Sequence, residues 1–446
     1  MFSDMPTIAA AGRAFRSGTR TPRELVEFCA ARIESLEPRL RAWVALDLQE
    51  ARREADRQGE LLRRGDDLGP LQGIPLGIKD LIDIAGWPTQ AGSPLRRRHR
   101  ASHDAPLIAR LRQAGAILLG KTVTTEFACF DPPPTRNPWH VEHTPGGSSS
   151  GSAVAVAVRM CPAALGSQTG GSIIRPASFC GVAGLKPTFG RVGIDGVVPV
   201  SRHLDHVGPL ARTVADLAVV FAALDGSPSP ASGGLRNGEP PGRPAVRLVV
   251  FREFFRSAAD GAVLDALDDA LARLVAGGAS VEECPLPLEF SEVHRRHRDL
   301  MAYETAQVHL QDFSAHADAY GPHVAGLIRE GLDIASHEAD SQRYATALLR
   351  QQEFRAVVHR LLGDHTVALM PSTLSPAPGI DTTGDPRFNS PWSFAGTPAV
   401  TIPCGLSGEG LPCGLQLVGG LDTDYQLLDV AAWCEQQIQF TAHPPL

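Results

Sequence analysis

The chain has 446 residues, of which 43% are hydrophobic and 20% are charged, a composition typical of a globular protein with a large core. Its 42 basic and 49 acidic residues give a formal net charge of −7, so charge provides no reason to expect nucleic acid or an anionic membrane as partner. The eight cysteines show no CxxC spacing, and neither a signal sequence nor an apolar stretch near the roughly 18 residues of a membrane-spanning helix is visible. We therefore expect a cytoplasmic protein whose thiols stay reduced.

The first half of the chain contains a clear helix start followed by a region of buried elements. Thr21 to Glu24 form a capping box with proline at the first helical position, and apolar residues then recur on one face, which predicts an amphipathic helix that ends near Pro38. Between Gly73 and Pro209, short apolar runs alternate with turns rich in glycine and serine. This pattern predicts buried strands and helices around a site.

The second half alternates between predicted strands and helices. Residues 226–244 are too rich in glycine, proline and serine for a core element and predict an exposed connection. After them we expect strands at 246–251, 279–287, 366–371 and 397–405, a helix at 263–275, and a polar helical stretch over 291–362. The alternation predicts one α/β domain over residues 1–446 with a mostly buried sheet.

Two short motifs match known patterns but lack the surroundings that these patterns need. Residues 115–122, GAILLGKT, fit the phosphate-binding loop, yet their apolar middle residues predict a strand, so nucleotide binding is not favoured. Residues 147–151, GSSSG, fit the nucleophile elbow with Ser149 as nucleophile, yet the stretch before them is not a hydrophobic strand.

Charged and metal-binding side chains give no stronger signal. The basic run 96–100 is interpreted as a solvated loop. Some histidines stand three or four residues apart, such as His99 and His103, His203 and His206, and His294 and His297. None of these pairs belongs to HExxH or joins a cysteine or carboxylate cluster at ligand spacing. We therefore expect neither a metal site nor a cofactor.

Lysine is rare in this sequence, and one lysine lies in an apolar run. Only three of the 42 basic residues are lysines, namely Lys79, Lys121 and Lys186. Lys79 stands in the segment PLGIKDLIDIAG. Arginine stays protonated in proteins, whereas an amine in an apolar setting can lose its proton and act as a base. Two Gly-Gly-Ser units follow, around Ser148 and Ser172, and such glycines free backbone N–H groups to bind an oxyanion. Together these residues are typical of a serine hydrolase with a lysine base.

The segments that carry these residues resemble the amidase signature family. They are GIPLGIKDLIDIAG, GAILLGKTVTTEFA, PTRNPW, TPGGSSSGSAVAVA, GSQTGGSIIRPASFCGVAGLKPTFGRV and GPLARTVADLA, in the family's order and spacing. The similarity is dense over about 70–218, the expected signature core, and continues thinly to NSPWSFAGTPAVTIPCG near the C-terminus. The resemblance implies an α/β fold with a large mixed twisted β-sheet covered by helices on both sides, and a variable substrate-side region at about 226–365.

The resemblance also implies the residues of the site. Lys79 matches the family's catalytic lysine, and Ser172 matches its nucleophile. Ser148 matches the bridging serine, which follows a cis peptide bond from Gly147 and has Ser149 beside it as support. The amides that would hold the oxyanion are those of Thr169, Gly170, Gly171 and Ser172.

Two departures from the common family pattern bear on the substrate. Gln168 stands where many members have aspartate, and Ile173 and Ile174 shift the following arginine to Arg175. This form resembles the malonamidase branch, in which the arginine grips a substrate carboxylate, while a structural ion pair is the alternative role for Arg175. The departures argue against the glutaminase subunit of the transamidosome. Asp205 matches a position that buttresses the glycine-rich loop.

The resemblance implies a hydrolase that cleaves the C–N acyl bond of a small linear amide through an acyl-enzyme. Esters and carbamates stay open as substrates, as do a glutaminase role in a multi-chain amidotransferase and a binding protein without turnover. A small amide or carbamate is the expected ligand, and a homodimer stays open. The substrate is expected to contact the N-terminal helices, the loop CFDPPPTRNPW and the stretch 291–362.

Overall fold

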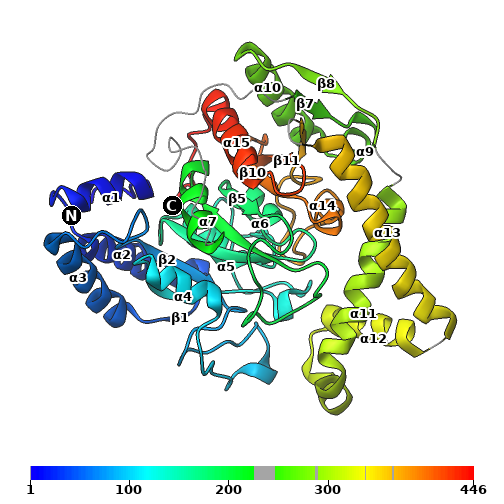
Figure 1. Ribbon diagram of the computed structural model, residues 1–446, viewed down its shortest axis with the longest axis horizontal. Coiled ribbons are helices and arrows are strands. Elements are labelled where there is room, and N and C mark those ends of the chain that lie inside the picture. Colours follow the sequence, from blue (N-terminus) through cyan, green and yellow to red (C-terminus); the bar gives the residue numbers. More distant parts are fainter. Residues whose placement is uncertain (1, 226–246, 287–289, 337, 364–365) are drawn as a thin grey trace.

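One 11-stranded β-sheet forms the centre of the computed structural model, which describes residues 2–225, 247–286, 290–336, 338–363 and 366–446. The strand order is β1-β3-β2-β4-β6-β5-β10-β11-β9-β7-β8, and the two end strands, β1 and β8, lie far apart in the molecule (Figure 1). The strands are β1 Trp43–Leu46, β2 Pro75–Lys79, β3 Ile117–Thr122, β4 Ala163–Gln168, β5 Ala183–Lys186, β6 His206–Ala211, β7 Arg247–Val250, β8 Val281–Glu283, β9 Thr366–Pro371, β10 Ala399–Leu406 and β11 Pro412–Val418.

The sheet is mixed, and apolar side chains cover both of its faces. Strand β2 runs parallel to β3 and β4, whereas β4 pairs with β6 and β10 pairs with β11 in antiparallel register. Successive residues of a strand point to opposite faces. In β7, Leu248 and Val250 accordingly pack into one hydrophobic core and Val249 into a second. The mixed sheet with helices on both sides that the family resemblance implied is therefore confirmed.

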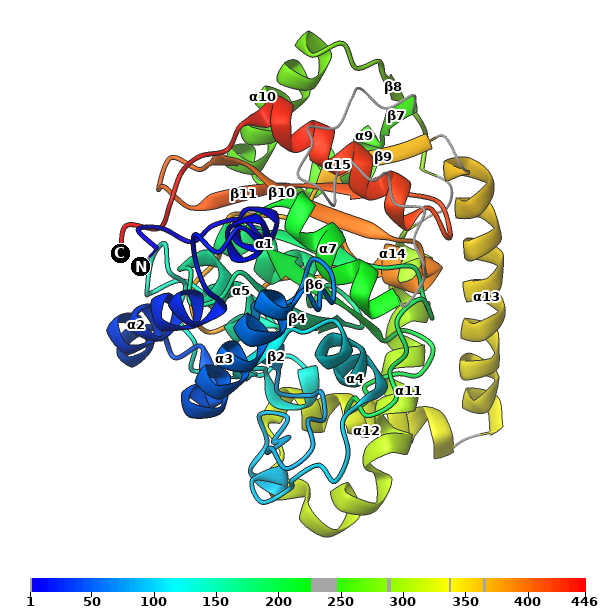
Figure 2. The ribbon, with the colours of Figure 1, turned by 60° about the vertical axis from the view of Figure 1, so that its left-hand side comes forward.

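The helices lie around this sheet, with α7 and α15 on one side and α13 at the margin of the molecule (Figure 2). They are α1 Ile8–Arg16, α2 Pro22–Leu40, α3 Leu48–Arg64, α4 Pro106–Gln113, α5 Ser150–Ala157, α6 Ile174–Cys180, α7 Val214–Asp225, α9 Arg252–Ala258, α10 Gly261–Ala276, α11 Phe290–His316, α12 Pro322–Ser336, α13 Glu338–Leu362, α14 Ser390–Ala395 and α15 Asp424–Ile438. Among the helices of the described ranges, none has the length and apolar character to cross a membrane.

The N-terminal capping box is confirmed, but its helix continues beyond the proline expected to end it. Thr21 Oγ1 accepts from the amide of Glu24, whose side chain accepts from the Thr21 amide. Helix α2 passes through Pro38 and ends at Leu40, before the left-handed Arg41. A proline so close to the end removes only one of the last intrahelical hydrogen bonds, so the helix tolerates it.

The later elements follow the expected order. The predicted strands correspond to β7, β8, β9 and β10, and the predicted helix at 263–275 is α10. The helical stretch at 291–362 divides into α11, α12 and α13, and α9 was not predicted. The connection expected at 226–244 lies outside the described residues. The division into a signature core and a variable region stays a prediction.

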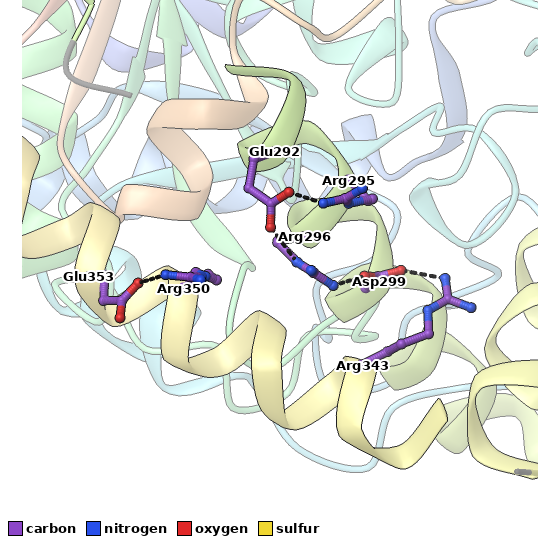
Figure 3. Close-up of polar contacts among 7 residues, drawn as sticks. All are labelled: Glu292, Arg295, Arg296, Asp299, Arg343, Arg350 and Glu353. Carbon is purple, nitrogen blue, oxygen red and sulfur yellow. Dashed lines mark hydrogen bonds and ion pairs between the residues drawn. The ribbon is translucent and has the colours of Figure 1, made fainter. Parts of the chain in front are cut away.

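Ion pairs hold α13 against α11 (Figure 3). The buried carboxylate of Asp299 on α11 accepts from Arg343 of α13 at 2.7 Å and from Arg296 at 3.2 Å. Glu292, about two turns before Asp299, pairs with Arg296 at 2.8 Å and also with Arg295. Because Asp299 is buried, its pair is screened less by salt than the exposed pairs of these helices. The contacts fix α11, which also supplies part of the cavity described below.

We expect Gly331→Ala and Gly326→Ala, two substitutions on α12, to have opposite effects on stability. A Cβ at Gly331 would lie 2.0 Å from the backbone oxygen of Ala302, so α11 and α12 would have to separate. A Cβ at Gly326 would meet no atom within 4 Å. The free energy of unfolding should fall by about 1–3 kcal/mol for Gly331→Ala. For Gly326→Ala it should rise by about 0.5–1 kcal/mol, because alanine is the better helix former.

Urea denaturation measures both changes. Equal effects of the two substitutions would contradict the close contact between α11 and α12.

Candidate active site

The sheet brings Lys79 to the serines. Lys79 is the last residue of β2, which runs parallel to β4 with Ile78 opposite Leu165, so the carboxyl ends of both strands meet at one edge. The amine of Lys79 is fully buried there, and its Nζ lies 2.7 Å from Ser148 Oγ, within hydrogen-bond distance. The amine donates to Ser149 Oγ and Ser167 Oγ, each at 2.9 Å. Ser167, near the end of β4, was not among the predicted site residues.

Burial favours the uncharged form of this amine. Removal from water lowers the pKa of Lys79 well below its ordinary value of 10.5, and the Asp205 carboxylate opposes this shift only in part. A neutral amine keeps two N–H groups and one lone pair. Ser149 Oγ gives its own proton to the Ser167 carbonyl oxygen at 3.2 Å, so it accepts from Lys79. If Ser167 Oγ takes the second N–H, the lone pair is left to accept a proton from Ser148.

Ser148 and its neighbours are held by the turn into α5. The Gly147–Ser148 peptide bond is cis, as the family resemblance implied. Ser149 is the N-cap residue of α5, and Ser150 Oγ donates to the Gly146 carbonyl oxygen at 2.6 Å. Ser149 therefore contacts the lysine from a helix end, without the hydrophobic strand that a nucleophile elbow requires.

Ser172 lies beside Ser148 but does not hydrogen-bond to it. The Ser149 amide donates to the Ser172 carbonyl oxygen at 3.2 Å, which fixes the two segments together. The Ser172 side chain lines the adjoining cavity, and its Oγ forms no hydrogen bond with any residue in the described ranges. Ser148 Oγ thus contacts one of the two partners that the predicted relay requires. Catalytic hydrogen bonds of this kind often tighten only in the complex with substrate.

The glycine-rich loop presents backbone N–H groups to the same cavity. Residues 169–172 line it, and the amides of Gly170, Gly171 and Ser172 form no hydrogen bond with the residues that the structure describes. Gln168 Oε1 instead accepts from the amides of Ile173 and Ile174, at 2.8 and 3.0 Å, and so caps α6. The free amides of the loop have the chemistry of an oxyanion hole.

Asp205 supports the loop from behind, as expected from its position. Its carboxylate accepts from Thr169 Oγ1 at 2.6 Å and from the Val200 amide at 2.8 Å. Burial raises the pKa of Asp205 to about 6, although these hydrogen bonds favour the carboxylate. Asp205 therefore fixes the side chain of Thr169 without lining the cavity.

The cavity in front of Ser172 has a volume of about 730 Å³ and a largely apolar lining. Phe130 comes from the loop after β3, Phe254 from α9, and Phe290 and Met301 from α11. The loop CFDPPPTRNPW and the stretch 291–362 thus contribute as predicted, but α12 and α13 supply no lining residue from the described part of the chain. The expected contribution of the N-terminal helices is wrong, because α2 and α3 pack on β2, β3 and each other.

Arg175 borders the same cavity and is almost fully buried. One of its nitrogens, Nη2, donates to the Gly147 carbonyl oxygen at 2.8 Å, while Nε and Nη1 are buried without a hydrogen-bond partner among the described residues. Burial lowers the pKa of Arg175 to about 10, and the Asp385 carboxylate counteracts this shift. Within the described residues Arg175 forms no ion pair, and the nearby Asp385 pairs with Arg387 at 2.6 Å. The structural ion pair that was the alternative role for Arg175 is therefore not observed.

The remaining sequence candidates lie away from this site or have other roles. Lys121, in the match to the phosphate-binding loop, lies in β3 and pairs with Asp80 at 3.0 Å, both fully buried. The basic run 96–100 lies mostly exposed in a loop. No group of three or more histidine, cysteine, aspartate or glutamate side chains in the described ranges is arranged to hold a metal.

The comparisons with known proteins agree with this geometry. The family model described as Amidase matches residues 24–428. The chain is 34% identical over 460 residues to a glutamyl-tRNA(Gln) amidotransferase subunit of Chloroflexus aggregans, in an alignment that covers 93% of this chain and 92% of that one.

Solved structures show the same relationship. The peptide amidase from Stenotrophomonas maltophilia is 30% identical with a TM-score of 0.82, over 98% of both chains. A second solved structure is 31% identical with a TM-score of 0.89, over 99% of this chain and 100% of that one. It is described as part of a vestigial protein complex that reveals the evolutionary origins of an s-triazine catabolic enzyme. The protein is therefore an enzyme, a hydrolase of C–N bonds. The chain belongs to the amidase signature family.

We expect the free energy of unfolding of the wild type to rise, relative to that of Lys79→Met, as the pH increases from neutral toward the ordinary lysine pKa of 10.5. In this window the unfolded chain carries a proton on Lys79 that the folded protein lacks, so stability increases with pH. Methionine cannot bind this proton. Urea denaturation across the window measures the difference, and parallel curves would mean that Lys79 keeps an ordinary pKa when folded.

Proposed function

We propose that this enzyme hydrolyses a small linear amide through an acyl-enzyme on Ser172, with Lys79 as base and Ser148 as the bridge between them. The observation that carries the proposal is the buried amine of Lys79, 2.7 Å from Ser148 Oγ, beside a cavity that Ser172 lines. A buried neutral lysine with a serine partner is a recognised way to activate a nucleophile.

The mechanism follows from these contacts. Neutral Lys79 takes the proton of Ser148 as Ser148 takes that of Ser172, whose Oγ attacks the substrate carbonyl carbon. The amides of Thr169, Gly170, Gly171 and Ser172 stabilise the negative charge that forms on the carbonyl oxygen. Ser148 then protonates the leaving amine and regains a proton from Lys79. Water releases the acid through the same relay, so every proton returns to its starting group.

A fluorophosphonate should label Ser172 in the wild type and leave Ser172→Ala unlabelled. Lys79→Ala should lower kcat/KM by about 10²–10⁴-fold, the range for loss of a general base. Ser178→Ala is the matched control, since Ser178 is a buried serine on α6 whose Oγ has no hydrogen-bond partner in the structure, and it should be labelled like the wild type. Mass spectrometry of the labelled peptide identifies the serine, and a label on any other residue would contradict the assignment.

We further propose that the substrate carries a carboxylate that meets Arg175. Among the cationic side chains that line the cavity, Arg298 pairs with Glu330 and Arg387 pairs with Asp385, whereas Arg175 forms no ion pair with a described residue. A buried charge without a partner is unfavourable, and a planar carboxylate matches the guanidinium geometry. Two buried nitrogens of Arg175 without partners support this assignment.

Arg175→Gln should reduce kcat/KM for malonamate by about 10- to 100-fold, because a hydrogen bond between charged groups contributes about 1.5–3 kcal/mol. The glutamine side chain ends where the arginine Nε lies, so this variant also loses the hydrogen bond from Nη2 to the Gly147 carbonyl oxygen, and a control substrate must measure that effect. A neutral amide of similar size is the control, and its kcat/KM should change by no more than about twofold. An equal loss for both substrates would assign Arg175 a structural role.

A glutaminase role in an amidotransferase complex is the second candidate function. It is supported by the 34% identity to the Chloroflexus aggregans amidotransferase protein over 92% of its length. Gln168 and the shifted Arg175 favour the free amidase. Purified chain that hydrolyses amides without partner chains supports the amidase, whereas glutaminase activity that requires them supports the alternative. Carbamates and esters form a similar tetrahedral intermediate and belong in the same substrate screen.

The thiols support a reducing compartment such as the cytoplasm. All eight cysteines are free, and all but Cys284 are buried. Buried free thiols are typical of intracellular proteins.

A further inference from the structure

Each backbone carbonyl oxygen of residues 167–172, the loop that ends at Ser172, accepts a hydrogen bond. The Ser167 oxygen accepts from Ser149 Oγ at 3.2 Å, and the Gln168 oxygen from His206 at 3.3 Å. Backbone amides hold the last two, since the Gly171 oxygen accepts from Arg175 at 2.9 Å and the Ser172 oxygen from Ser149 at 3.2 Å.

The two carbonyl groups in the middle of the loop are held by side chains from distant parts of the chain. The Thr169 oxygen accepts from His297 Nε2 of α11 at 3.0 Å. The Gly170 oxygen accepts from Ser393 Oγ of α14 at 2.8 Å. These two donors are separated from their acceptors by 128 and 223 residues of sequence.

A held carbonyl group also fixes the direction of the next N–H. The peptide unit is planar, and in the trans form its C=O and N–H point in opposite directions. The one cis bond in the described ranges is Gly147–Ser148, so both peptide units are trans. His297 therefore orients the N–H of Gly170, and Ser393 orients the N–H of Gly171. Both N–H groups stay without a partner in the described structure, on a loop that lines the cavity.

We propose that His297 and Ser393 are positioning residues for the oxyanion hole, which act by holding the carbonyl groups of Thr169 and Gly170. This inference rests on the proposed function, because it assigns a task to two of the amides that would stabilise the oxyanion. A preorganised donor stabilises the transition state more than the bound substrate, so its orientation affects kcat more than KM.

The state of His297 fits this task. Its side chain is buried, and burial lowers its pKa to about 4, so the imidazole is neutral near pH 7. Since a carbonyl oxygen only accepts, Nε2 carries the proton in this tautomer. A Cβ at Gly170 would lie 3.5 Å from His297 Cε1, in ordinary van der Waals contact, so the ring lies beside the loop with room for a methyl group between them.

Ser393 links two parts of the loop. Its Oγ accepts from Gln168 Nε2 at 3.1 Å and donates to the Gly170 oxygen. Gln168 in turn caps α6 through the amides of Ile173 and Ile174. The glutamine amide supplies both the acceptor for α6 and the donor for Ser393, whereas an ionised aspartate supplies only acceptors. Gln168 can therefore hydrogen-bond to Ser393 and to the start of α6 at the same time, which an ionised aspartate could not do.

The test compares His297→Phe, which keeps a ring without a donor, with His297→Gln, whose amide can still donate to Thr169. We expect His297→Phe to lower the rate of fluorophosphonate labelling at Ser172 and kcat by about 10²-fold, with KM nearly unchanged. His297→Gln should recover most of both rates. Ser393→Ala should also lower kcat, with KM little changed, and it keeps the test decisive if His297→Phe does not fold.

The matched control is His309→Phe. His309 is another buried histidine of α11, but it contacts Tyr320 and lies outside the cavity lining, so its labelling rate should equal that of the wild type. Wild-type rates in folded His297→Phe and Ser393→Ala, or a loss that falls on KM alone, would overturn this inference while leaving the nucleophile assignment intact. Failure of the wild type to label at Ser172 would overturn the proposed function and this inference with it.

Discussion

The Lys79 amine reaches Ser148 because β2 and β4 are parallel neighbours whose ends meet at one edge of the sheet. This position removes the amine from water, which favours the neutral base, and it also places two further serines around the nitrogen. Ser149 and Ser167 can occupy the N–H groups, so that the lone pair points to the remaining hydroxyl. Burial and orientation thus come from a single feature of the topology, and a lysine on an exposed loop would have neither.

The site combines two parts of the chain that have different tasks. The signature segments supply Lys79, Ser148 and Ser172, all on or next to β2, β4 and α5. Helices α11 and α14 supply contacts to the outer side of the glycine-rich loop and, with α9, much of the cavity lining. The pairing of Asp299 with Arg343 fixes α11 on α13 (Figure 3). The helical region therefore both lines the cavity in front of Ser172 and contacts the glycine-rich loop.

The sequence predicted the parts of the structure that local patterns determine. Lys79, Ser148 and Ser172 stand in recognisable segments, and the alternation of residues 246–275 predicted β7 and α10. The contacts of His297 and Ser393 could not be predicted in this way, because they join residues 128 and 223 positions apart. The pairing of β5 with β10 is equally distant in sequence. Ser167 was within reach, since it precedes the Gly-Gly-Ser unit, but its contact with Lys79 depends on the register of β2 and β4.

The two buried basic side chains of the site, Lys79 and Arg175, respond to burial in different ways. The lysine can lose its proton, so Lys79 becomes uncharged and needs only hydroxyl partners. The guanidinium of Arg175 stays protonated near neutral pH even though burial lowers its pKa to about 10, so its charge needs an anion or remains unfavourable. The Gly147 carbonyl oxygen gives Arg175 one hydrogen bond and no charge. The same low-dielectric environment thus favours an uncharged amine at one side of the Gly147–Ser148 turn, and at the other it leaves a charged guanidinium without an ion pair among the described residues.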